Sequence, residues 1–210
     1  MLAVASEESK LHEIEVMTWF SVMKIFKRDL ESFGDTKIFI NSISNQFLAE
    51  EELKVFEELY APLLNRIAIE MSEEENINED VACCKQTAAK KWKAAITIEN
   101  LGIHYEENTS LQYIAPKYVK VDMSIVQNIN QGENWKNLLR NNINYFQNKN
   151  IQVIAEGIET PEELKILVEM GVDYVQGYYL SIPQEIPPRL KQNQRDELLE
   201  LSGISNEQEK

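Results

Sequence analysis

Six short, mostly apolar runs recur along the chain, and each presents a polar residue at its end. They are KIFIN (residues 37–41), RIAIE (66–70), AAITIE (94–99), YVKVD (118–122), QVIAE (152–156) and DYVQG (173–177). Near-continuous apolar runs of about five residues are typical of strands in a parallel sheet that is covered on both faces. The sequence therefore predicts parallel strands with polar residues at their carboxyl ends.

Segments with the apolar spacing of helices separate these runs. We expect helices over residues 11–25 (with a possible cap at Ser6), 49–60, 79–92, 135–149 and 161–170, and a last charged helix from about residue 189. Thr160 and Glu163 have the spacing of a capping box, with Pro161 at the first helical position. Alternating strands and helices predict an α/β fold with a parallel sheet.

The polar residues at the strand ends suggest one shared site. In a (β/α) barrel, catalytic and binding groups gather at the carboxyl ends of the strands. The alternative is that strands end in polar residues because the loops that follow are exposed to water. This explains any single polar strand end, but it explains six of them less well.

Composition excludes several classes of protein. The chain has 210 residues and a formal net charge of −14, whereas bulk nucleic-acid binding needs a positive surface. No apolar run approaches the ~20 residues of a membrane span, and the acidic start MLAVASEESK does not resemble a signal peptide. We therefore expect a cytoplasmic protein. The adjacent Cys83 and Cys84 lack a second pair for a zinc site, so we expect them to serve packing.

The predicted rim combines carboxylates, an amide and a lysine. Oxygen ligands of this kind suit Mg²⁺ or Mn²⁺. No Ser-His-Asp arrangement is available, because the chain's only histidines are His12 and His104, and no glycine-rich phosphate loop occurs. Metal-assisted phosphodiester hydrolysis is the chemistry that such a rim supports best. Crowded carboxylates repel, so we expect at least one of Glu70, Glu99 and Glu156 to have a raised pKa.

Several of these segments resemble one family. VIAEGIET (153–160) and DYVQGYYLSIP (173–183) resemble the C-terminal motifs of EAL domains, the cyclic di-GMP phosphodiesterase family. YVKVDMSIV (118–126), RIAIEMSE (66–73) and FINSISNQFL (39–48) resemble its lysine, glutamate and asparagine strands. The resemblance implies a TIM-barrel-like fold that hydrolyses cyclic di-GMP to a linear dinucleotide with two Mg²⁺ or Mn²⁺ ions.

The resemblance also implies roles for individual residues. The metal ligands would be Asn41, Glu70, Glu99, Asn100 and Glu156, and the catalytic residues would be Lys120, which positions water, and Glu156. Supporting residues would be Glu73, Asp122, Glu159 and Gln176. For Glu73 and Glu159, a solvated or capping carboxylate is the competing interpretation.

Two departures from the family pattern stand out. The chain starts after the strands with which the family opens, one of which carries the Glu-Ala-Leu motif, so we expect an incomplete barrel. The family's Asp-Asp-Phe-Gly stretch is Glu99-Asn100-Leu101-Gly102 here, which replaces one carboxylate by an amide.

These departures favour a degenerate EAL-like module over residues 1–187, followed by a C-terminal helix and charged tail over 188–210. Its expected role is regulation or binding within cyclic di-GMP signalling, with little hydrolysis and with a protein partner or a second copy. The rival hypotheses are an active metal-dependent phosphodiesterase and a remnant without function.

Overall fold

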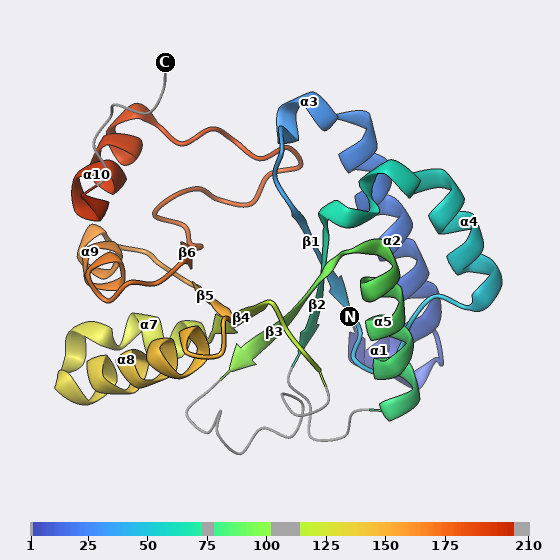
Figure 1. Ribbon diagram of the computed structural model, residues 1–210, viewed down its shortest axis with the longest axis horizontal. Helices are drawn as coiled ribbons and strands as arrows, with labels where there is room; N and C mark the ends of the chain where they lie inside the picture. The colour runs from blue at the N-terminus through green and yellow to red at the C-terminus, as the bar shows by residue number, and fades with distance from the viewer. Residues whose placement is uncertain (1, 73–77, 102–113, 204–210) are drawn as a thin grey trace. The chain divides into compact units, whose positions relative to one another are not determined.

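The structure is a computed structural model that describes residues 2–72, 78–101 and 114–203. Helices and strands alternate along it (Figure 1). The described residues fall into two compact units. The first comprises residues 2–72, 78–99 and 114–117, and the second comprises residues 100, 101 and 118–203.

The first unit is built on three parallel strands. Its elements are α1 (Leu2–Glu7), α2 (Leu11–Arg28), α3 (Leu30–Phe33), β1 (Ile38–Ser42), α4 (Glu50–Tyr60), η1 (Ala61–Arg66), β2 (Ile67–Ser72), α5 (Glu79–Trp92) and β3 (Ala95–Leu101), whose last two residues belong to the second unit. Strand β2 lies between β1 and β3, with Ile40 beside Ile69 and Ile69 beside Ile96. The central strand β2 is buried from Ile67 to Met71, as a sheet covered by helices requires, whereas β1 is only partly buried.

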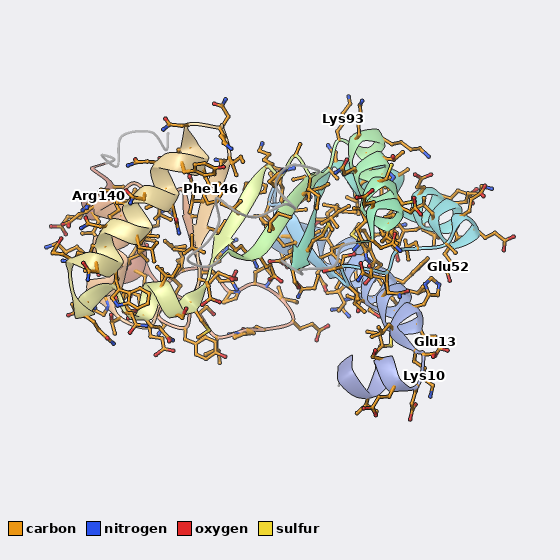
Figure 2. All side chains as sticks on the ribbon, turned by 90° about the horizontal axis from the view of Figure 1, so that it is seen from below. Lys10, Glu13, Glu52, Lys93, Arg140 and Phe146 are labelled. Carbon is orange, nitrogen blue, oxygen red and sulfur yellow. The ribbon has the colours of Figure 1, made fainter. Side chains whose placement is uncertain are left out.

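An aromatic cluster forms the core between the helices of this unit. The ring of Trp19 on α2 is fully buried, 5.4 Å from the rings of Phe47 and Phe56 and 6.0 Å from that of Trp92. The rings meet edge to face, the arrangement that aromatic quadrupoles favour. Charged side chains such as Glu13 and Lys93 project outward from the helices instead (Figure 2).

The second unit repeats the pattern with its own parallel strands. Its elements are β4 (Tyr118–Val121), α7 (Met123–Gln127), η3 (Ile129–Gln131), α8 (Glu133–Gln147), β5 (Gln152–Ala155), α9 (Pro161–Glu169), β6 (Tyr174–Val175) and α10 (Gln192–Ser202). Strand β5 lies between β4 and β6, with Lys120 beside Ile154 and Ile154 beside Tyr174. Helix α8 packs on β5, and α10 packs on α9.

The predicted strands and most predicted helices are confirmed, with local corrections. Ser6 does not cap the long helix, because it lies inside α1 and the helix α2 follows Lys10 without a side-chain cap. Cys83 and Cys84 are exposed on α5, so the expectation that they serve packing was wrong. The neighbouring residues Ala82 and Lys85 occupy the buried face of that helix instead.

Candidate functional site

In the first unit, three predicted site residues share one face of the sheet. Asn41 pairs with Glu70 across β1 and β2, and Glu70 pairs with Thr97 across β2 and β3. Side chains alternate along a strand, so Glu99, two residues after Thr97, faces the same side. A carboxylate oxygen of Glu70 lies within 4.8 Å of one of Glu99. The strands thus bring Asn41, Glu70 and Glu99 together near their carboxyl ends.

These carboxylates differ in their surroundings. Glu70 is 4% exposed, whereas Asn41 is open to solvent. Burial raises the pKa of the Glu99 carboxyl above its ordinary value. This pKa shift has the direction that we expected from repulsion between carboxylates. Its cause is instead removal of the carboxyl from water, which disfavours the charged form.

The donor set of this face fits a hard divalent cation. Two carboxylates within 4.8 Å of each other and an adjacent amide oxygen are the ligands that Mg²⁺ and Mn²⁺ prefer. Asn100 belongs to β3, but its side chain is outside the described part of the structure, as is the whole of Glu73. Their assigned roles stay predictions.

In the second unit, the buried Lys120 forms an ion pair with the partly buried Glu156. The Nζ atom of Lys120 lies 3.1 Å from Oε1 of Glu156, and the two side chains are 7% and 18% exposed. Lys120 is on β4, and Glu156 is the first residue after β5. Burial lowers the pKa of Lys120, and the Glu156 carboxylate beside it acts in the opposite direction.

The segment after Glu156 is fixed by two sets of hydrogen bonds. The Glu163 carboxylate accepts from the Glu159 and Thr160 amides at 2.8 and 3.1 Å, and the Thr160 hydroxyl accepts from the Glu163 amide at 3.2 Å. This is the predicted capping box. On the other side, the Ile158 amide donates to the Gln176 carbonyl at 3.1 Å. The direction of Glu156 is therefore set by the entry to α9 and by β6.

A cavity of about 330 Å³ opens beside this ion pair. It is lined by the predicted residues Asp122, Glu156, Glu159 and Gln176, together with Tyr178 and Ser181. Four predicted residues from three separate loops thus border one space, whose volume is in the range of small-molecule sites.

Some predicted supporting residues also have local structural tasks. Asp122 caps α7, since its Oδ1 accepts from the Ser124 amide at 2.8 Å. Glu159 is exposed and accepts from the Gln127 side chain at 3.3 Å. The exposure of Glu159 favours the competing interpretation, a solvated carboxylate, although the side chain also borders the cavity.

Carboxylates, an amide and a buried lysine near the carboxyl ends of parallel strands form the arrangement that is typical of sites in α/β proteins of the barrel class. The family model that describes the EAL domain matches residues 1–183. The chain belongs to the EAL domain family.

Individual relatives agree with this assignment. The probable cyclic di-GMP phosphodiesterase PdeN of Escherichia coli is 26% identical over 118 residues, which are 56% of this chain and 23% of the relative. The chain therefore spans about a quarter of that relative's length.

Solved structures share the fold. The EAL domain of Xanthomonas citri FimX in complex with c-diGMP gives a TM-score of 0.74 at 18% identity, covering 91% of this chain and 78% of that one. The manganese and cy-diGMP complex of Klebsiella pneumoniae BlrP1 gives 0.69 at 21% identity, covering 82% of this chain and 45% of that one. The predicted α/β, TIM-barrel-like EAL fold is confirmed. Among the described residues, no helix is long and apolar enough to cross a membrane.

Proposed function

We propose that this chain is a regulatory EAL module that binds cyclic di-GMP with a divalent cation and hydrolyses it slowly. The observation that supports binding most directly is the Lys120–Glu156 ion pair beside a cavity lined by Gln176 and Glu159. The relatives' names and the complexes of structural neighbours with cyclic di-GMP support the same ligand.

In this proposal each polar residue has a defined task. Asn41, Glu70, Glu99 and Glu156 would hold Mg²⁺ or Mn²⁺. The bound cation would supply charge for the phosphodiester and an acidified water. Lys120, buried and held by Glu156, would orient that water or neutralise a phosphate oxygen.

Slow hydrolysis is proposed because of residue 100. The family's second aspartate is Asn100 here, which keeps the shape of the side chain and loses its charge. Adjacent cations repel each other, and anionic ligands must offset this repulsion. An amide at this position therefore weakens the binding of two cations together more than it weakens the binding of a single cation.

The second candidate is an active phosphodiesterase. The Lys120–Glu156 ion pair favours this second candidate, because a module that only binds its ligand does not need a buried lysine held by a carboxylate. A regulatory module would instead act by binding a protein partner or a second copy of the chain. Gel filtration with and without nucleotide measures directly whether such a complex forms.

Binding and turnover separate the two candidates. We expect the chain to bind labelled cyclic di-GMP with Mn²⁺ and to release little linear dinucleotide. Asn100→Asp should raise turnover, on the order of 10- to 100-fold, the usual size of effects from a changed metal environment. Lys120→Ala is the control and should abolish turnover in both backgrounds. Rapid Lys120-dependent turnover by the unaltered chain would establish the second candidate, and absence of binding would refute the proposal.

A further inference from the structure

Two buried charged residues outside the predicted site hold the segment that follows Asn41. Glu15 on α2 is 1% exposed, and Lys85 on α5 is fully buried. Both reach the segment at residues 42–44, where β1 ends, from two helices of the same unit (Figure 1). Charged side chains are rarely this buried, because removal of an ion from water is costly.

The Glu15 carboxylate binds the chain at residues 42 and 43. It accepts from the Ile43 amide at 2.8 Å and from the Ser42 hydroxyl. The indole N–H of Trp19 donates to the same carboxylate at 2.9 Å. Because Trp19 is part of the aromatic cluster, the carboxylate is held in a fixed place and shielded from water.

Lys85 binds the next peptide carbonyls. Its Nζ atom donates to the Ile43 carbonyl at 2.7 Å and to the Ser44 carbonyl at 3.4 Å. The Ser44 hydroxyl in turn donates to the Ser72 carbonyl at the end of β2, at 3.3 Å. An anion and a cation thus hold the N–H and C=O groups of Ile43, two residues after Asn41.

We infer that Glu15 and Lys85 are positioning residues that fix the direction of Asn41 toward its cation. The inference rests on the proposed function in one respect, the role of Asn41 as a ligand. Strand β1 ends at Ser42, and within the described residues its pairing with β2 does not continue beyond that point. The two charged side chains supply hydrogen bonds to the backbone there. Outer partners of metal ligands act in this way by orienting the ligand and need not touch the cation.

Four variants test the inference in the full chain. Lys85→Met removes the ammonium group, Glu15→Gln keeps the shape and one acceptor, and Asn41→Ala removes the ligand. Ala89→Gly is the control, because it weakens the same helix one turn away at a buried position, and the methyl group that it removes makes no hydrogen bond to residues 42–44. Affinity for Mn²⁺ alone, followed by the electron paramagnetic resonance of free Mn²⁺, is measured beside the hydrogen exchange of the Ile43 amide.

The expected pattern is specific to positioning. Asn41→Ala and Lys85→Met should weaken Mn²⁺ binding by about 10- to 100-fold, and Glu15→Gln by less. Ala89→Gly should keep the affinity although it lowers the melting temperature. If Lys85→Met does not fold, Glu15→Gln decides the question.

Mn²⁺ affinity that falls in Asn41→Ala but is unchanged in Lys85→Met and Glu15→Gln would overturn the inference. A different outcome is that the chain binds no Mn²⁺ even without substitution. That outcome refutes the metal part of the proposed function, and the Ile43 amide then decides: faster exchange in Lys85→Met and Glu15→Gln, but not in Ala89→Gly, supports positioning, and unchanged exchange refutes it.

Discussion

Gly177 lies directly against the backbone of Ile158. A Cβ atom placed on Gly177 would be 2.1 Å from the Ile158 carbonyl oxygen and 2.2 Å from its nitrogen. Hydrogen bonds from the Ile158 amide to Gln176 and from the Tyr179 amide to Ile158 join the same segments at 3.1 and 3.0 Å. Because both partners are backbone, neither can move aside without breaking these bonds.

Gly177→Ala should therefore damage both stability and the site. We expect a loss of about 1–3 kcal/mol or more in urea unfolding, the usual cost of overpacking, and weaker cyclic di-GMP binding. Gly171→Ala is the matched control: its φ of +78° is strained for alanine, but among the described residues other than its chain neighbours no heavy atom lies within 4 Å of the added Cβ. It should lower stability and leave binding intact. Equal effects of both substitutions on binding would contradict this account.

Asn142 on α8 is a second residue with a clear energetic consequence. The side chain is fully buried, and neither Oδ1 nor Nδ2 has a hydrogen-bond partner among the described residues. A buried polar group without a partner costs about 1–3 kcal/mol. Asn142→Leu should raise the free energy of unfolding by a similar amount, measured in urea. A lower value would show that an ordered water satisfies the amide, and Asn142→Ala, which opens a cavity, serves for comparison.

At the scale of the element, helix α9 depends on its first turn. Thr160→Ala removes the hydroxyl that accepts from the Glu163 amide and should lower stability by ~1 kcal/mol, the usual value of a cap. Thr160→Ser keeps the hydroxyl and should cost less. A melting temperature that does not change in the alanine variant would mean that this bond is absent in solution.

At the scale of the whole molecule, cation binding should raise the stability of the folded state. A ligand that binds only the folded state at 100 times its Kd adds about 2.7 kcal/mol. We expect millimolar Mn²⁺ to raise the melting temperature of the chain, and Glu70→Gln to reduce that rise. A melting temperature that does not respond to Mn²⁺ or Mg²⁺ would refute cation binding by Glu70 and Glu99.

The strands, and the positions of the candidate site residues at their ends, could be predicted because their signals are local. An apolar run marks a buried strand, and a carboxylate at its end, such as Glu70, lies where the ligands of a barrel gather. The capping box of Thr160 is equally local. The sequence analysis missed the capping role of Asp122, although an aspartate directly before a helix is a recognisable cap signal.

The remaining features depend on contacts between distant segments. Glu15 and Lys85 look like ordinary polar positions on amphipathic helices, and only the approach of α2 and α5 to the segment at residues 42–44 buries them. The exposure of Cys83 has the same origin: the register in which α5 packs decides which of its faces is covered.

The hydrogen bonds of α10 show that the folded unit extends beyond the residues that match the family model. The family model ends at residue 183, yet Gln194 on α10 donates to the Tyr179 and Leu180 carbonyls at 2.6 and 3.1 Å. Glu197 accepts from the Tyr179 hydroxyl at 2.7 Å. A chain cut at residue 183 would keep every recognisable motif and lose the groups that hold the segment after Gly177. Recombinant versions of this domain, and chimeric proteins that contain it, should therefore extend past Ser202.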